Sequence, residues 1–159
     1  MRQEPSRQID SKALKVWKLS GLITSSIFIL LAIGSIVLAI LTPVPFWISI
    51  LTVIAALLLT YLFVVVIPEI QYRVWRYEID EYEIELKFGL FIIRRILVPM
   101  VRVQHVDTKQ GPLLRRYQLS SVTITTAATT HEIPALDNET ANQVRDFISQ
   151  RARVTEDDV

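Results

Sequence analysis

The chain has 159 residues, a formal net charge of +1 and no cysteine. This length allows one small domain, with or without a membrane anchor. The missing cysteines exclude disulfides, thiolate catalysis and cysteine-type zinc sites. Because the net charge is close to zero, it gives no reason to expect an acidic substrate, and we expect no nucleic-acid partner.

Residues 1–18 form a basic segment, and a long apolar stretch follows it. From Leu19 to Pro68 there is no charged residue and no histidine, and only Thr42–Pro45 interrupts the apolar run. Each half is close to the roughly 20 residues that cross a bilayer as a helix. The sequence therefore predicts a two-helix transmembrane hairpin over residues 19–68, with spans of about 19–41 and 46–67.

The flanking charges predict the orientation of this hairpin. Lysine and arginine residues precede the first span, Arg73 and Arg76 follow the second, and the loop between the spans is uncharged. By the positive-inside rule, the side that carries the basic residues is the cytoplasm. We therefore expect a multi-pass protein of the cell membrane with both termini in the cytoplasm and the lipid bilayer as its first partner.

Both spans carry stripes of small residues, which allow helices to approach closely in lipid. The stripe of the second span is regular, and that of the first is looser; their members are Thr52, Ala56 and Thr60, and Gly21, Ser25, Ala32 and Ala39. One interpretation is that the two spans pack on each other. The alternative is a face for a homo-oligomer.

The region after the hairpin predicts antiparallel strands. Apolar and polar residues alternate with a period of two, as in half-buried strands. The expected strands cover residues 75–80, 82–88, 91–98, 101–107, 120–127 and 131–134, with a loop or short helical turn from Gly111 to Tyr117. Tight turns are expected at Asp80-Glu81 and at Gly89-Leu90.

A closing helix is predicted at the C-terminal end. Asp137 suits the N-cap position, and apolar residues then recur at helical spacing, namely Ala141, Val144, Phe147 and Ile148. Residues 154–159 form an acidic tail. We therefore expect residues 69–153 to be a domain built as a small, partly open barrel with the helix closing one end.

No pattern in the chain predicts catalysis or a bound metal. His131-Glu132 resembles the start of a zinc-binding H-E-x-x-H motif, but Ala135 replaces the second histidine and Pro134 breaks the required helix. No phosphate-binding glycine loop and no recognisable nucleophile context occur. We therefore expect no enzyme activity, no metal and no cofactor.

One polar segment between the middle strands is a candidate structural motif, made of Arg102, Gln104, His105, Asp107, Gln110, Gly111 and Pro112. One interpretation is that Arg102, Gln104 and Asp107 brace the loop by hydrogen bonds. A second interpretation is functional, because a basic patch near a membrane attracts anionic lipid. The candidate interaction patch consists of Arg94, Arg95, Arg115 and Arg116.

This motif resembles the bacterial pleckstrin-homology-like (PH-like) family. The similar residues run from Arg102 to Asp107, from Gln110 to Leu114 and into Thr125–Ala127. With two spans before a single such domain, nearly the whole chain resembles the YdbS-like membrane proteins. The resemblance implies a PH-like split barrel with a C-terminal capping helix, and a larger membrane protein with several PH-like domains as partner.

One position departs from the family pattern. The family usually has Gly-Leu after the basic loop, where this chain has Gln118-Leu119. If the turn requires a positive φ, Gln118 carries strain there, because side chains with a Cβ disfavour that conformation.

The first turn of the domain argues against one ligand class. Eukaryotic-type PH domains bind phosphoinositides through a basic first turn, whereas this turn is Asp80-Glu81 with further glutamates around it. The sequence thus favours a membrane-anchored binding or scaffolding module, a subunit of a membrane complex. The alternative is direct recognition of anionic lipid through the basic patch.

Overall fold

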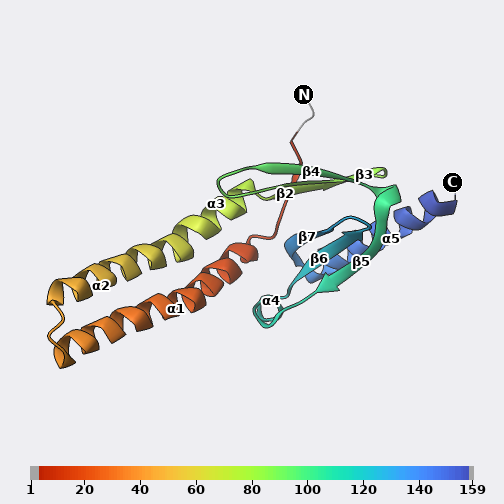
Figure 1. Ribbon diagram of the computed structural model, residues 1–159. Coiled ribbons are helices and arrows are strands. Elements are labelled where there is room, and N and C mark those ends of the chain that lie inside the picture. Colours follow the sequence, from red (N-terminus) through yellow and green to blue (C-terminus); the bar gives the residue numbers. More distant parts are fainter. Residues whose placement is uncertain (1–3, 158–159) are drawn as a thin grey trace. The chain divides into compact units, whose positions relative to one another are not determined.

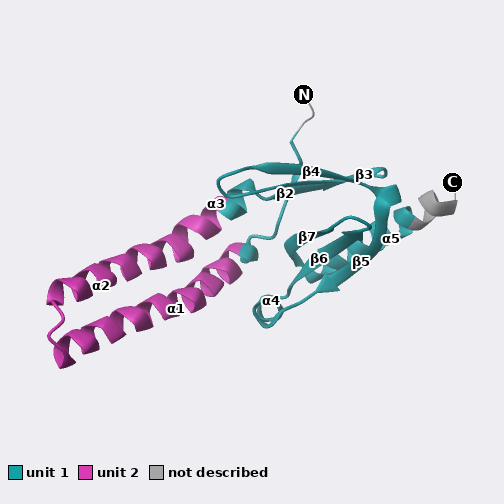
Figure 2. Cartoon of the chain, viewed as in Figure 1, with its two compact units in different colours: residues 1–13, 71–159 teal, residues 14–70 magenta. Residues whose placement is uncertain are grey.

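The computed structural model describes residues 4–157, with their side chains through residue 152. It contains two compact units, residues 14–70 and residues 1–13 with 71–159 (Figures 1 and 2). Arg2 of the predicted basic segment and the last two residues of the predicted acidic tail lie outside the described residues.

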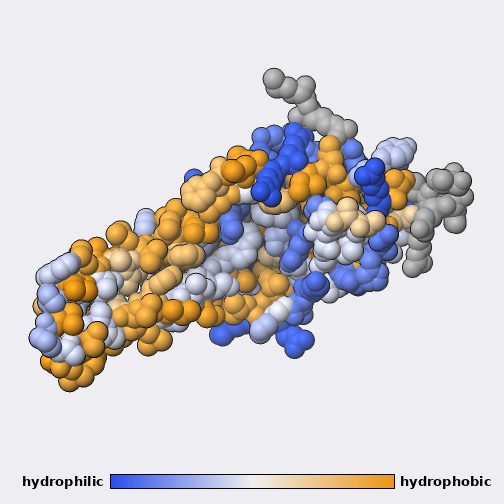
Figure 3. Space-filling view, in the orientation of Figure 1, coloured by the Kyte–Doolittle hydropathy of each residue, from blue (hydrophilic) through white to orange (hydrophobic). Residues whose placement is uncertain are grey.

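The first unit is the apolar hairpin. Helix α1 spans Lys12–Leu41, and α2 (Phe46–Tyr61) continues through a π-helical turn, Leu62–Val66, into α3, Ile67–Val74. Both helices are long and apolar enough to cross a membrane, and only 11% and 6% of their most apolar windows are buried. Apolar residues cover their surface in Figure 3, as expected for helices that face lipid rather than a soluble core.

The two helices pack on each other through their small residues, so that interpretation of the stripes is confirmed. Ser25, Ala32 and Ala56 are buried. A Cβ at Gly21 would overlap the backbone carbonyl of Phe63 on the other helix. The Ser35 and Thr52 hydroxyls lie 2.6 Å apart and form a hydrogen bond, so hydroxyl groups join the helices where the lipid offers no hydrophobic drive.

The π-helical turn has a cause in the sequence. Proline has no backbone N–H, and its ring clashes with the carbonyl four residues earlier in a regular helix. Pro68 lies two residues after the end of this turn, and the N–H of Ile67 bonds to the Leu62 carbonyl with the wider π spacing. The helix therefore continues past Pro68 to Val74, beyond the predicted end of the second span.

The second unit contains two antiparallel sheets and a long helix. Sheet A has the order β1-β2-β3-β4, and its strands are Arg7–Gln8, Arg76–Ile79, Glu83–Phe88 and Arg94–Pro99. Sheet B has the order β5-β6-β7, with strands Val103–Lys109, Leu119–Thr126 and Thr130–Asp137. Helix α4 (Pro112–Arg116) connects β5 to β6, and α5 (Asn138–Asp157) ends the chain.

The core of this unit combines both sheets with α5. Fully buried side chains include Ile84 and Leu86 of sheet A, Ile124 and Ile133 of sheet B, and Ile148 of α5. The predicted helix face is confirmed in Ala141, Val144 and Ile148, while Phe147 remains half-buried. The architecture is a PH-like split barrel with a C-terminal capping helix.

The N-terminal segment belongs to this barrel, which the sequence analysis did not predict. Residues Arg7 and Gln8 pair with β2, opposite Tyr77 and Arg76. Pro5 and Ile9 are buried, and the N–H of Asp10 bonds to the Ala135 carbonyl of β7 at 3.3 Å. The predicted division at residues 18 and 69 therefore differs from the observed units, because the hairpin is inserted between the first two strands of the barrel.

Two predicted strands were wrong at their ends. The strand expected from Phe91 begins only at Arg94, because Gly89 adopts a φ of 141° and starts a longer turn. The strand expected over residues 131–134 reaches Asp137, because a bulge with Ala135 at φ 50° continues the strand beyond Pro134. A bulge adds one residue to a strand while its pairing continues on both sides.

Candidate functional site

The motif expected from Arg102 to Pro112 runs along one edge of sheet B. It begins in a short 3-10 helix, Met100–Arg102, follows β5 and enters α4. The side chains of Arg102 and Gln104 are exposed, and neither makes a hydrogen bond within the described part of the chain. The bracing role predicted for these two residues was therefore wrong, because both side chains are exposed, Arg102 at the end of the 3-10 helix and Gln104 on the edge strand β5.

A groove lies where β4 turns into β5. It has a volume of about 520 Å³ and extends from the end of β4 to the turn between β6 and β7. Arg102 and Gln104 line it, together with Leu97 and Val101, which are 44% and 58% exposed. This β5 groove combines apolar side chains with an exposed guanidinium and an exposed amide, a composition typical of a surface that binds another molecule.

His105 and Asp107 lie beside the groove on the same strand. The His105 Nε2 lies 3.2 Å from the Asp107 carboxylate, and both side chains are more than half exposed. His105 lines a second hollow of about 330 Å³ with Arg145 and Asp146 of α5. Among residues 4–157, no group of three histidine or acidic side chains lies together in a metal-binding arrangement.

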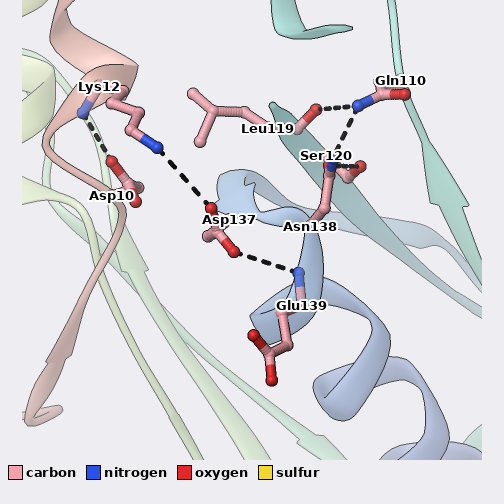
Figure 4. Close-up of polar contacts among 8 residues, drawn as sticks. All are labelled: Asp10, Lys12, Gln110, Leu119, Ser120, Asp137, Asn138 and Glu139. Carbon is pink, nitrogen blue, oxygen red and sulfur yellow. Dashed lines mark hydrogen bonds and ion pairs between the residues drawn. The ribbon is translucent and has the colours of Figure 1, made fainter. Parts of the chain in front are cut away.

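Gln110, at the other end of the motif, is the residue that braces the loop (Figure 4). Its Nε2 donates to the Leu119 carbonyl at 2.9 Å and to Asn138 Oδ1 at 3.0 Å. Ser120 Oγ donates to the same Asn138 oxygen at 2.7 Å. The amide of Asn138 thus joins the end of β5, the start of β6 and the first residue of α5.

The start of α5 is held by Asp137, as the predicted cap requires. Its Oδ2 accepts a hydrogen bond from the Glu139 N–H at 3.2 Å, which satisfies a donor of the first helical turn. Its Oδ1 lies 3.8 Å from Lys12 Nζ, and the Lys12 N–H donates to Asp10 Oδ1 at 2.7 Å (Figure 4). The N-terminal segment therefore reaches the same corner of the barrel.

Gly111 and Pro112 begin the helix α4, with the proline in its first turn. The helix ends at Arg116, and Gln118 follows with a φ of 58°. The turn does require a positive φ at Gln118, the condition under which the sequence predicts strain there. The Gln118 carbonyl accepts a hydrogen bond from the Asn138 N–H at 3.2 Å. The strained turn therefore contacts the start of α5, as Gln110 does.

The arginines of the candidate patch do not form one surface. Arg94 and Arg95 begin β4, whereas Arg115 and Arg116 lie on α4, and Figure 1 shows these elements at opposite edges of the domain. Arg95 forms an ion pair with Glu85, a carboxylate that is only 8% exposed. The four arginines therefore form two separate pairs, and Arg95 has a structural partner. Their role in an interaction stays a prediction.

Two groups with shifted pKa values lie outside the β5 groove: Tyr77 on β2, and Glu4 in the segment before β1. Burial raises the pKa of Tyr77, and the neighbouring Arg7 opposes that shift. A hydrogen bond and the positive charge of Lys87 lower the pKa of the exposed Glu4 carboxyl, whose Oε1 lies 2.6 Å from Lys87 Nζ. Both contacts attach the N-terminal segment to the barrel, and neither indicates a site of chemistry.

Leu97 and Val101 are surface residues that the sequence pattern did not predict. Both belong to segments predicted as strands, and an apolar residue in a strand is normally assigned to the core. The only available signal was Pro99 between them, since proline inside a sheet is confined to edges and bulges.

Comparison with known proteins gives one family and one relative. The family model for the bacterial PH domain matches residues 25–152. A relative described as UPF0699 transmembrane protein YdbS, from Bacillus subtilis (strain 168), is 49% identical over 159 residues, which is 100% of both chains. No solved structure matches the chain.

Proposed function

The chain belongs to the bacterial PH domain family, and on that premise we propose that it is a non-catalytic, membrane-anchored module that binds a protein partner through the β5 groove. The main support for this proposal is the composition of the β5 groove. Two exposed apolar side chains, Leu97 and Val101, lie there beside the exposed Arg102. Protein interfaces are built in this way, with an apolar centre and a polar rim.

The partner we propose is a larger membrane protein with several PH-like domains. The β5 groove lies between the outer strands of the two sheets, since β4 ends sheet A and β5 begins sheet B. A sheet edge and an adjacent apolar groove suit a second folded β-domain, because such edges accept a further strand. A second copy of this chain would use the same surface.

Site-specific photocrosslinking tests this proposal in native membranes. A photoreactive phenylalanine analogue at Val101 should form one discrete adduct, whereas the same group at Asn142 should form none. Asn142 is the control because it is exposed on α5 and does not line the groove. An adduct of twice the chain mass would identify a homodimer, and the absence of any Val101 adduct would refute a protein partner at this groove.

We propose further that the hairpin crosses the cell membrane twice and leaves both termini in the cytoplasm. The insertion of the hairpin between β1 and β2 supports this, because residues before and after it fold into one barrel and must lie on one side. The basic flanks support the cytoplasm as that side, by the positive-inside rule. Reporter fusions at Met1 and Val159 should both report the cytoplasm, and an external signal at either end would contradict the proposal.

The second candidate function is recognition of anionic lipid by arginines. Arg115 and Arg116 are adjacent and both exposed on α4, which favours lipid contact at that helix. The full chain purified with Arg115→Ala and Arg116→Ala should then retain less anionic lipid than the parent. Equal retention would remove this candidate.

We propose that the chain does not select phosphoinositides, because the first turn of the barrel is acidic. Glu81 of the first turn pairs with Arg151 at 2.6 Å, but Asp80 beside it keeps the turn acidic. The test uses the full chain in nanodiscs, because residues 4–13 contribute to the barrel. Head-group-specific binding at physiological salt would contradict this expectation, since non-specific attraction is screened there.

A further inference from the structure

The loop between β3 and β4 carries an exposed apolar tip that the β5 groove does not involve. Phe91, Ile92 and Ile93 are 92%, 72% and 58% exposed. A run of consecutive exposed apolar residues is costly in water and is normally absent from a soluble surface unless it has a function. Two arginines, Arg94 and Arg95, follow it directly.

The shape of this loop is fixed by its first residue. Gly89 has a φ of 141°, and a Cβ there would overlap the backbone carbonyl of Ile92. Only glycine adopts this conformation without strain. The turn therefore closes tightly on Gly89 and leaves the three apolar side chains outside the barrel.

The strand register places this tip at the end of sheet A where the chain arrives from the hairpin. Arg76, the first residue of β2, lies opposite Lys87 near the end of β3. The ring of Trp75, which directly follows α3, stacks on that of Phe88 with centroids 5.9 Å apart. Figure 2 shows the β3–β4 loop beside the end of α3 within the same compact unit.

We propose that the Phe91–Ile93 tip inserts into the cytoplasmic surface of the same bilayer that holds the hairpin. The chain reaches this loop's neighbours Trp75 and Arg76 directly after α3, so only a few residues separate them from the second span. Apolar side chains bind a bilayer surface by burial among the acyl chains, and the neighbouring exposed Arg94 favours anionic headgroups. The tip thereby fixes how the barrel is oriented on the membrane, whatever partner occupies the β5 groove.

Spin labelling tests the insertion, and a chain without cysteine makes it direct. Nitroxides are attached at Ile92→Cys and, as control, at Tyr82→Cys, which lies in the β2–β3 turn at the opposite end of β3. The full chain is placed in nanodiscs of phosphatidylcholine and phosphatidylglycerol. Accessibility to oxygen and to a water-soluble nickel complex should place the Ile92 label about 5–10 Å below the phosphates, and the Tyr82 label in water.

Two further measurements distinguish insertion by apolar burial from contact with a protein partner and from purely electrostatic attachment. Adding Phe91→Asp should move the Ile92 label into water, whereas Val101→Asp, at an exposed apolar position of the β5 groove, should not. Insertion driven by apolar burial should persist in pure phosphatidylcholine. An Ile92 label in water, a label shielded from both reagents as under a protein partner, or a depth lost without anionic lipid would each overturn the proposal.

Discussion

The two ends of β5 have similar polar sequences and different surroundings. At the start, Arg102 and Gln104 are exposed at the β5 groove. At the end, Gln110 bonds to Leu119 and Asn138 and so joins β5 to β6 and α5. The difference shows that a single motif combines a surface available for binding with a brace that holds the surface in place.

The largest loss of stability should come from β4, where Arg95 forms an ion pair with Glu85 and the adjacent Arg94 is exposed. Arg95→Ala leaves the buried Glu85 carboxylate without its partner. Removing one member of a buried ion pair costs about 3–5 kcal/mol, and because Arg95 is about one-third exposed we expect about 1–3 kcal/mol. Thermal unfolding of the full chain in detergent would measure this loss.

Arg94→Ala is the matched control, since Arg94 is exposed on the adjacent position of the same strand. A surface substitution of this kind changes stability by about 0.5 kcal/mol or less. Equal losses in the two variants would show that the ion pair contributes nothing specific.

The next effect concerns the bonded end of β5. Gln110→Ala removes the donor to the Leu119 carbonyl and to Asn138, and a typical hydrogen bond contributes about 1 kcal/mol. We expect a loss of about 1–2 kcal/mol in the free energy of unfolding by denaturant titration. Gln104→Ala, the same substitution at the exposed start of β5, should leave the free energy of unfolding within about 0.5 kcal/mol of the parent value.

The smallest effect is a gain. Gln118 has a φ of 58°, a conformation that costs about 1–2 kcal/mol for a residue with a Cβ. Glycine removes this strain but loses about 0.5–1 kcal/mol of backbone entropy, so Gln118→Gly should stabilise the chain by about 0.5 kcal/mol. Gln118→Ala keeps the Cβ and should give no gain, and a similar rise in both melting temperatures would contradict the strain argument.

The sequence predicted the hairpin, the strands and the capping helix because their signals are local. An uncharged apolar run and the alternation in Tyr82–Phe88 depend on neighbouring residues alone. The pairing of Arg7–Gln8 with β2 could not be predicted in this way, because the two strands are separated by the whole hairpin.

The candidate site was predicted only in part, for the same reason. The motif from Arg102 to Pro112 was found by its composition. Which of its side chains form hydrogen bonds and which are exposed depends on residues that are distant in the sequence. Gln110 meets Asn138, 28 positions later, through the crossing of β5, β6 and α5. Phe91–Ile93 has the apolar character of a strand, and only the turn at Gly89 shows that it is a surface loop.

The central claim is that the start of β5 is a binding surface and not a brace. The most direct measurement combines Arg102→Ala and Gln104→Ala in the full chain and records both its melting temperature and the Val101 photoadduct in native membranes. We expect a melting temperature close to that of the parent, since exposed residues change stability by about 0.5 kcal/mol or less, together with a weakened or absent adduct. A marked loss of stability with an undiminished adduct would contradict it.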